Sequence, residues 1–277
     1  MLHRTFMIES DNQDTQNLEL QCDVVEQKLL KDAIMENKIQ VIGQLSNSSN
    51  GALLGEITLE DQKFSVIIKP SMYENPLIDF EWGTLSKREV AAYELSSLLA
   101  WNIVPMTVLR DVENLECSVQ LFIPHDPRQH YFSLTKFYKE DMERFAVFDY
   151  LINNADRKAG HILAEENESF ILKLQSTQDE SILDPISNKN LFGIDHGLSF
   201  NVEEKLRTVI WEFSEQQISQ HLLVDISNSF NSIERILKPF LNKHEIEKTI
   251  LRAEQLLMNP YHKALDANSR AFPWPLV

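Results

Sequence analysis

Acidic side chains that could do chemistry together stand in two short polar stretches of the chain. The first stretch, 153–161, holds Asp156, and the second, 193–198, holds Asp195. The first follows a helical pattern and the second ends a short apolar run, so Asp156 is expected in a loop after a helix and Asp195 at the end of a strand. Phosphoryl transfer from ATP needs one carboxylate that aligns an acceptor and one that holds a metal ion, because it depends on positioning and on neutralised phosphate charge. The two stretches therefore predict a phosphotransferase site.

The elements that hold these stretches follow from apolar spacing. Apolar residues recur at intervals of three and four over 142–152, which predicts an amphipathic helix that runs into the 153–161 loop. Two short apolar runs, 161–164 and 170–172, are separated by polar residues and predict a β-hairpin, and 191–195 is a third candidate strand. A buried helix and short strands would therefore present the two polar stretches.

Upstream, β-like runs alternate with polar turns and predict a small antiparallel lobe with one helix. Strong helix formers with apolar residues on one face predict that this helix begins near Ser86. An earlier helix is expected within 24–37, after the almost wholly polar segment 9–19. The five expected strands are 39–45, 52–59, 64–69, 104–109 and 117–123.

Lys69 is the candidate cation of this lobe, because it follows the apolar run of the third strand and precedes Pro70. A lysine there can pair with ATP phosphates and with a helix glutamate, although a strand-end lysine that only reaches solvent has the same pattern. Glu89 is the expected partner, and Glu94 is a second candidate. The spacing from Ser86 to Glu89 also matches a capping box, in which Glu89 would bond to the helix N-terminus instead.

The two motifs resemble those of a known kinase superfamily. Asp156-Arg157 with its short loop, followed by Ile194-Asp195-His196-Gly197-Leu198-Ser199-Phe200, is similar to the catalytic and metal-binding pair of the phosphatidylinositol 3/4-kinase-like superfamily. The resemblance is closest to the type II phosphatidylinositol 4-kinases and to an uncharacterised bacterial subgroup of kinase-like proteins, which it matches over about 39–275. It implies an α+β, two-lobed protein-kinase-like fold, with a small antiparallel β lobe carrying one helix and a mainly helical larger lobe.

The resemblance also implies roles for particular residues. Asp156 would be the catalytic residue that orients the acceptor hydroxyl, with Asn154 and Arg157 in support. Asp195 would bind the metal ions that bridge the phosphates. Glu89 stands at the position that pairs with the strand lysine, which favours the ion pair over the capping box.

One residue departs from the family pattern. The family carries an asparagine five residues after the catalytic aspartate as a second metal ligand, and here that position is His161. Imidazole binds Mn²⁺ and other transition metals but suits Mg²⁺ poorly, so the resemblance implies a changed metal preference or the loss of the second metal. Asp195 and His161 are the expected metal ligands, and ATP with a divalent metal, Mg²⁺ or Mn²⁺, is the expected cofactor set.

Two further segments are expected to contact ATP. The small residues of the first turn would let backbone N–H groups approach phosphate oxygens, although the turn lacks the G-x-G-x-x-G pattern and an ordinary hairpin loop would look the same. The fifth strand would lead into a hinge whose backbone groups meet the adenine edge. The residues concerned are Ser48, Ser49 and Gly51 in the turn, and Gln120, Phe122 and Ile123 at the hinge.

The overall charge limits the classes of partner that the protein is expected to bind. The 277 residues include 26 Lys and Arg against 42 Asp and Glu, so the formal net charge is −16. Such a field repels phosphates, so we expect no nucleic-acid partner and no stable membrane association. Cys22 and Cys117 have no metal-ligand spacing, and no apolar stretch reaches the roughly 18 residues of a membrane span. These features favour a cytoplasmic protein.

The expected organisation has three parts. They are a mobile leader over 1–23, an N-terminal kinase-like lobe over 24–123, and a C-terminal helical lobe over 124–277 that carries the catalytic and metal-binding loops. In the last part, 175–190 is expected to be a surface insertion, and the prolines of 272–275 predict an extended strap. Helices are expected at 214–222, 225–237 and 243–258.

The function expected from these features is ATP- and metal-dependent phosphotransfer to an unidentified small-molecule or protein hydroxyl. Two alternatives stay open: a nucleotide-binding pseudokinase without catalysis, because of His161 and the missing glycine pattern, and a kinase-like protein that transfers AMP. The acidic charge makes a phosphoinositide acceptor less favoured than the family name suggests.

Overall fold

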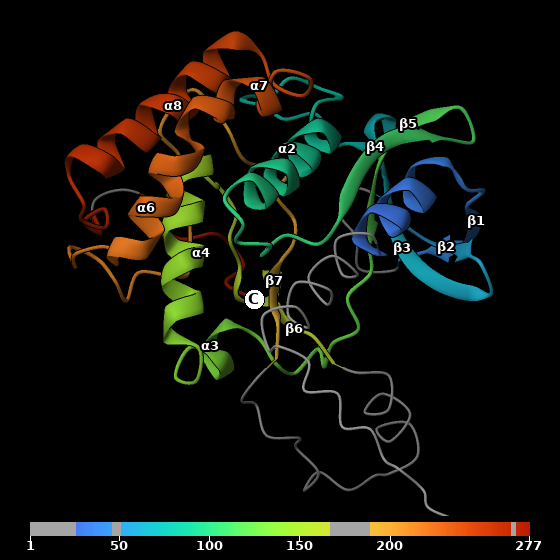
Figure 1. The fold of residues 1–277 in the computed structure, drawn as a ribbon, viewed down its shortest axis with the longest axis horizontal. Coiled ribbons are helices and arrows are strands. Elements are labelled where there is room, and N and C mark those ends of the chain that lie inside the picture. The colour runs from blue at the N-terminus through green and yellow to red at the C-terminus, as the bar shows by residue number, and fades with distance from the viewer. Residues whose placement is uncertain (1–25, 46–50, 167–188, 267–269) are drawn as a thin grey trace, which may run out of the picture.

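A five-stranded antiparallel sheet forms one side of the molecule (Figure 1). The computed structural model describes residues 26–45, 51–166, 189–266 and 270–277 of the chain. The predicted small β lobe is confirmed, and its strands run in the spatial order β1-β2-β3-β5-β4. The strands are β1 (Gln40–Gln44), β2 (Leu53–Leu59), β3 (Gln62–Pro70), β4 (Thr107–Val112) and β5 (Leu115–Leu121).

The sheet has its own apolar core, which one helix covers. Ile57 of β2 and Val66 and Ile68 of β3 are almost completely buried there, at the alternate positions that a pleated strand turns to one face. Ile34 packs into the same core from a helix whose described part covers 26–36. The helix expected within 24–37 is therefore present and closes one face of the sheet.

Helices form the larger part of the molecule, on the other side (Figure 1). The two-lobed arrangement of a sheet part and a helical part is thus the one predicted. The described α-helices are α2 (Leu85–Leu98), α3 (Tyr131–Leu134), α4 (Lys139–Ile152), α6 (Gln220–Ser229), α7 (Ile233–Leu237) and α8 (Lys243–Met258). Three 3-10 turns accompany them: η1 (Ser71–Tyr73), η2 (Ala159–His161) and η3 (Phe230–Ser232).

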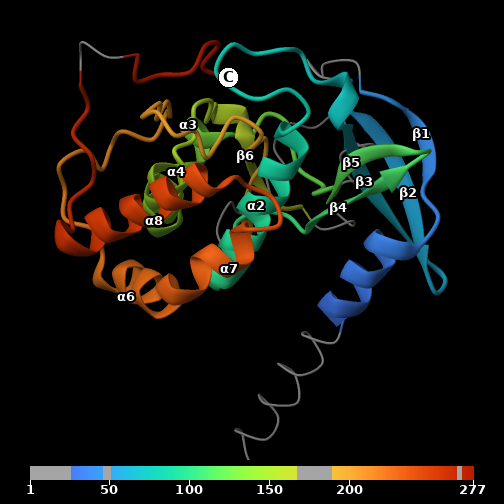
Figure 2. The same cartoon turned by 90° about the horizontal axis from the view of Figure 1, so that it is seen from above.

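Helix α2 lies between the sheet and the helices α7 and α8 (Figure 2). Although α2 was predicted as part of the small lobe, its buried residues Ala92 and Leu95 belong to the core of the helical part. Arg88 joins α2 to that part further, because it donates a hydrogen bond to the Ser199 carbonyl at 2.7 Å and forms a buried ion pair with Glu245 of α8. The helix therefore packs against the helical part on one side and against the sheet on the other.

Helix α4 runs through the core of the helical part and ends at the first polar stretch. Met142, Phe145 and Phe148 are completely buried, as the predicted amphipathic pattern requires. The helix stops at Asn153, which adopts a left-handed conformation with φ of 52° and caps the C-terminus. Asparagine tolerates this conformation, so the loop that carries Asp156 leaves a rigid, buried helix end.

Two short strands follow the loop. β6 (Ile162–Ala164) pairs antiparallel with β7 (Leu191–Gly193), and both are mostly buried. The predicted hairpin partner 170–172 and the insertion 175–188 lie outside the described residues. The pairing brings the second polar stretch, which follows β7, next to the loop after α4, because the Ile194 N–H donates to the His161 carbonyl at 3.0 Å.

Three sequence predictions differ from the structure. β4 begins at Thr107 rather than at 104, because Pro105 has no N–H for the strand ladder. The helix expected at 214–222 is wrong, since Ile218 donates its N–H to the Pro260 carbonyl and holds this segment in an extended contact. The helix expected at 225–237 is interrupted by η3.

The chain beyond α8 crosses the helical part without regular secondary structure; 272–275 is not helical, as predicted, but it bends at 272 and at 274–275 instead of running fully extended. We call residues 271–277 the C-terminal strap. Its end lies beside β6 and β7 in the view of Figure 1. Among the described helices, none is long and apolar enough to cross a membrane.

Candidate active site

Lys69 is the centre of a charge network between the two lobes. Its Nζ lies 2.5 Å from Glu89 Oε1 and 2.7 Å from Asp195 Oδ1. Burial alone would lower the pKa of Lys69, but the charges of Asp195 and Glu89 outweigh it and raise the pKa above the ordinary lysine value. The ammonium is therefore charged at all physiological pH values and is placed between a strand, a helix and the second polar stretch.

The structure decides between the alternatives for Glu89. Its side chain is buried, with Oε1 on Lys69, while Oε2 accepts the backbone N–H of His196 at 2.9 Å. The capping-box alternative is wrong, because Ser86 N–H is accepted instead by Glu74 Oε1 at 3.0 Å. Glu94, the second candidate, pairs with a lysine of the N-terminal helix. Glu89 is thus the glutamate that faces the candidate nucleotide site.

Asp195 adopts a left-handed backbone conformation, with φ of 64°, directly after β7. Its side chain is 51 % exposed, far more than the other charged groups of the network. The ammonium of Lys69 holds the pKa of Asp195 well below its usual range, so the carboxylate is ionised. An exposed, ionised carboxylate on a constrained backbone is suited to bind a cation that arrives with a nucleotide.

Asp156 stands on the loop after α4 and is fixed by its neighbours. Its backbone N–H donates to Asn154 Oδ1 at 2.9 Å, and Asn154 is completely buried. The Asp156 carboxylate forms an ion pair with Lys158 at 2.9 Å. Burial raises the pKa of Asp156, an effect that Lys158 opposes and the charge of Asp195 reinforces. A carboxylate whose proton affinity is raised is better placed to accept a hydroxyl proton.

Arg157 points away from the site, into the core. It is 0 % exposed, and its guanidinium contacts both oxygens of the equally buried Asp149 at 2.9–3.1 Å. It also donates to the Ile194 carbonyl at 2.9 Å and meets His196 Nε2 at 2.7 Å. Arg157 is therefore a positioning residue that ties the loop of Asp156 to the loop of Asp195, and does not reach a substrate.

His196 belongs to this buried hub and not to a metal site. Because Arg157 donates to Nε2, the other ring nitrogen, Nδ1, carries the proton, and this Nδ1 is buried with no hydrogen-bond partner among the residues that the structure describes. Burial, followed by the charge of Arg157, lowers the pKa of His196 well below the ordinary value, so the ring is neutral.

His161 faces Asp195 as the metal-ligand prediction requires. Its Nε2 lies 3.4 Å from Asp195 Oδ2. Burial lowers the pKa of His161 to about 4, although Asp195 opposes this. The ring is therefore uncharged near neutral pH and has a nitrogen lone pair that could bind a metal ion. Among the described residues no cluster of three or more His, Cys, Asp or Glu side chains could hold a metal ion. A carboxylate and an imidazole side by side fit a transition metal whose remaining ligands come from phosphates and water.

The predicted phosphate-covering turn is only partly described. Ser48 and Ser49 lie outside the described residues. Gly51 has φ of 65°, and a Cβ built on it would stand 3.3 Å from the ring of Tyr73, so glycine suits both the conformation and the contact. Gly51 therefore lies against Tyr73 of η1, which follows β3, the strand that carries Lys69.

The predicted hinge residues lie at the end of β5. Gln120 is inside the sheet, and its side-chain amide donates to Thr107 Oγ1 at 2.8 Å. The Phe122 N–H donates to a carbonyl of β3 at 3.0 Å, and its ring is 36 % exposed. The Ile123 carbonyl contacts His125 Nδ1 at 2.8 Å. Of these three residues, Phe122 offers the side chain that a nucleotide could reach.

Three residues of the site were missed by sequence reasoning. Asp149 falls on the apolar stripe of α4, seven residues after Met142 and four after Phe145. A charged residue at such a position was the sequence signal that could have indicated a buried ion pair. Lys158 was visible only as a cation two residues from Asp156. Glu74, which also accepts the Gly83 N–H at 2.8 Å, had no signal because it acts across an irregular segment.

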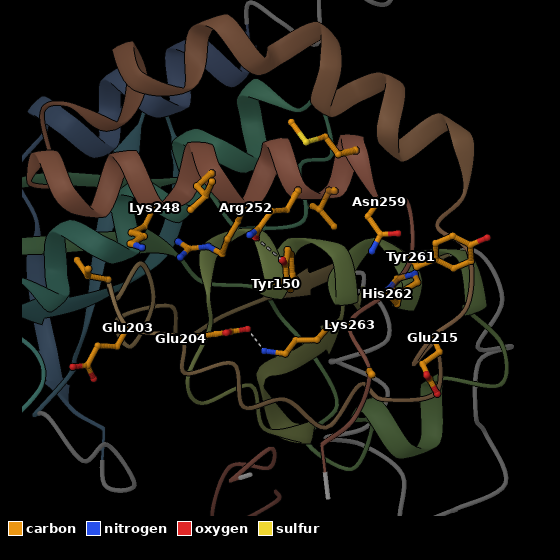
Figure 3. Close-up of a pocket in the computed structure, with 16 residues that line it drawn as sticks. Tyr150, Glu203, Glu204, Glu215, Lys248, Arg252, Asn259, Tyr261, His262 and Lys263 are labelled. Atoms are coloured by element: carbon orange, nitrogen blue, oxygen red, sulfur yellow. Dashed lines mark hydrogen bonds and ion pairs between the residues drawn. The ribbon is translucent and has the colours of Figure 1, made fainter. Parts of the chain in front are cut away.

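A surface cavity elsewhere in the helical part does not include this site. It has a volume of about 1060 Å³ and lies between α8, residues 202–204 and the segment 258–264 (Figure 3). An ion pair between Lys263 and Glu204 crosses it, and Tyr150 donates to Gln255 Oε1 at 3.0 Å on its wall. None of the predicted site residues lines this cavity. The candidate nucleotide site is defined by the charge network instead.

The fold and the two facing carboxylate loops define a kinase-like protein, and comparison with known proteins gives its family. Residues 105–268 match the family model described as phosphatidylinositol 3- and 4-kinase, so the chain belongs to this family. It is 31 % identical to Protein Rv2133c of Mycobacterium tuberculosis, over 87 % of this chain and 93 % of that protein.

Two solved structures are similar to the chain at low identity. One is hydra Fam20 with sugar, at 15 % identity and a TM-score of 0.48, covering 81 % of this chain and 85 % of the other. The second is the proinflammatory kinase CtkA of Helicobacter pylori, at 12 % identity and a TM-score of 0.47, covering 82 % and 94 %. The family assignment rests on the two sequence matches.

Proposed function

We propose that the chain is a phosphotransferase that uses ATP and a divalent metal to phosphorylate a hydroxyl group. The observation that carries the proposal is Lys69 held between Glu89 and Asp195, at 2.5 and 2.7 Å. A cation in this position can pair with the α- and β-phosphates once Asp195 turns to a metal ion. Family membership supports the reaction class, and the assignment of the individual residues is part of the proposal.

Each residue would have a defined task. Asp195, with His161 beside it, would hold the metal, which supplies charge neutralisation at the phosphates when it is bound. Asp156 would accept a hydrogen bond from the acceptor hydroxyl and take its proton. Lys158, paired with Asp156 at 2.9 Å, would then face the transferred phosphoryl group and offset its charge.

The organisation of the chain is part of the same proposal. We propose that a lobe over 24–123 contributes Lys69 and the phosphate-covering turn, and that a lobe over 124–277 contributes the two carboxylate loops. The net charge of −16 supports an acceptor other than an anionic membrane lipid. We also propose a cytoplasmic location, because two distant cysteines, Cys22 and Cys117, are typical of a reducing compartment.

A pseudokinase is the second candidate, and His161 is the observation that favours it. An imidazole replaces the family's amide ligand, and its contact with Asp195 at 3.4 Å would let the site bind nucleotide without a second metal.

Mass spectrometry of ATP incubated with the protein, a divalent metal and a cell extract distinguishes these functions. Phosphotransfer yields ADP and an acceptor that has gained a phosphate, whereas AMP transfer yields pyrophosphate and an adenylylated product. An Asp156→Asn variant is the control, because it keeps the shape of the side chain but cannot take a proton. Unchanged ATP with both Mg²⁺ and Mn²⁺, together with a normal ATP-induced thermal shift, would favour the pseudokinase.

A further inference from the structure

The C-terminal strap, a segment without regular secondary structure, lies against the catalytic loop at its end. Its first residue, Ala271, accepts hydrogen bonds from the Thr208 N–H and from the Trp211 indole, both at 3.1 Å. Near its end, the Leu276 carbonyl accepts the Ala159 N–H at 2.8 Å. Thr208 is also bridged to Arg157, the residue after Asp156. The strap therefore contacts the loop after the candidate catalytic aspartate and the segment that is bridged to Arg157.

The contacts with the catalytic loop are made three and four positions beyond Asp156. After the Ala159 contact, a Cβ built on Gly160 would stand 4.0 Å from Val277 Cγ1. Gly160 directly precedes His161, which faces Asp195 and hence the nucleotide side. The strap thus lies against the loop three and four residues after Asp156.

The strap is held in the manner of a ligand and not of a core element. Only Ala271 and Pro273 of the strap are buried. Trp274 is 80 % exposed and Val277 60 % exposed, so the large apolar side chains contribute little packing. The backbone carbonyls of Ala271 and Leu276 fasten the strap at its two ends, by the hydrogen bonds given above. A segment fastened in this way can be exchanged for another of the same conformation.

The strap has no hydroxyl side chain that could accept a phosphate. Residues 270–277 read Arg-Ala-Phe-Pro-Trp-Pro-Leu-Val and contain no serine, threonine or tyrosine. We propose that the strap occupies a groove for extended polypeptide beside Asp156, and that the acceptor is a protein segment carrying a hydroxyl, which displaces the strap. This inference rests on the proposed phosphotransferase function and names its substrate class.

Peptide binding tests the groove without requiring catalysis. A chain lacking 272–277 is titrated into a fluorescein-labelled peptide with the sequence of 270–277, and fluorescence anisotropy is recorded. We expect saturable binding, at least about tenfold tighter than to the full chain, because the strap competes there at a high effective concentration. In the truncated chain, Gly160→Leu should abolish binding, since it fills the place of Val277, and a scrambled peptide should not bind. No difference between truncated and full chains would overturn the proposal.

Phosphate transfer to the strap tests the acceptor assignment, and it uses the full chain in case the truncated one does not fold. Four variants, Trp274→Ser, Pro275→Ser, Leu276→Ser and Val277→Ser, are incubated with ATP and Mn²⁺ or Mg²⁺ and analysed by mass spectrometry. At least one introduced serine should gain a phosphate, at a rate independent of protein concentration. If the parent chain phosphorylates other acceptors while none of these serines reacts, the peptide groove is refuted and the proposed function stands. If ATP does not bind to the parent at all, the proposed function fails by itself.

Discussion

The carboxylate of Asp149 accepts hydrogen bonds from two nitrogens of Arg157, at 2.9–3.1 Å, and neither side chain is exposed. Asp149 also accepts from Asn154 at 3.0 Å and from Thr208 at 3.2 Å, so one side chain of α4 orders the loop after the helix and the segment after the second polar stretch. The geometry of the reacting groups therefore depends on a residue that touches neither nucleotide nor acceptor.

Replacing Asp149 with asparagine should destabilise the protein strongly. Asp149→Asn removes the charge that compensates the buried Arg157, and an uncompensated buried charge costs about 3–5 kcal/mol. Asp141→Asn is the matched control on the same helix, because its ion pair with Arg144 at 2.6 Å is partly exposed and should contribute no more than about 1 kcal/mol. Urea unfolding of both variants measures the difference. Equal effects would show that the buried pair does not organise the loops.

Removing Lys69 should abolish nucleotide binding, and it should also lower stability because Glu89 stays buried without its counterion. Lys69→Met deletes the ammonium that would meet the phosphates, and Asp195→Ala deletes the metal ligand, so neither variant should show the thermal shift that ATP with Mn²⁺ gives the parent. Lys63→Met is the control, since Lys63 is on the same strand but pairs with Glu56 at the far end. ATP binding by both site variants at parental affinity would place the nucleotide elsewhere.

Metal preference should depend on His161. Mn²⁺ should support ATP binding better than Mg²⁺, and His161→Asn should improve the response to Mg²⁺, because an amide oxygen suits the harder ion. Burial lowers the pKa of His161 to about 4, so its protonation should not weaken Mn²⁺-dependent binding between about pH 5 and pH 8. Calorimetric titrations with each metal check both statements. An unchanged metal preference in His161→Asn would make the histidine structural.

Stability should fall as the pH is lowered from neutral, and His262 should account for part of the slope. Burial lowers the pKa of His262, although Glu143, 3.4 Å away, opposes this, so the unfolded chain takes up a proton that the folded chain does not. The loss begins as the pH falls below the unfolded pKa of about 6.5, ends at the lower folded pKa, and is at most about 1.4 kcal/mol per pH unit between them. His262→Gln should reduce the slope of unfolding free energy against pH, and His244→Gln, which changes an exposed residue of α8, should not. Parallel slopes for all three chains would contradict this.

The spacing of apolar residues was enough to predict those helices and strands whose tertiary contacts favour the same conformation as their local sequence. The strands of the sheet and α4 have strict periodicity, and they form close to the predicted residues. The segment 214–222 has the same helical periodicity, but Ile218 is held by a backbone contact with Pro260, forty-two residues later. A pairing of that kind leaves no trace in the local pattern.

The site residues that could be predicted are those in which a charged side chain directly follows an apolar stretch of sequence. Lys69 after an apolar strand and Asp195 after β7 stood out for this reason, and the structure brings them to 2.7 Å. The capping role assigned to Glu89 as an alternative was plausible from spacing alone, and only the tertiary position of Glu74 excludes it. Asp149 was overlooked because a single charge on a helix stripe is hard to distinguish from an exposed helix position.

The packing of α2 has a mechanical consequence for the cycle of nucleotide entry and release. Because Leu95 and Arg88 fix the helix to the helical part, a rotation of the sheet away from α2 would have to break the hydrogen bond that Ser86 Oγ donates to the Lys69 carbonyl at 3.0 Å. Lys69 would then travel with the sheet while Glu89 stayed behind, still bonded to the His196 N–H. The ion pair between Lys69 and Glu89 would therefore form only when the sheet and the helical part are in the relative position that the proposed phosphate transfer requires.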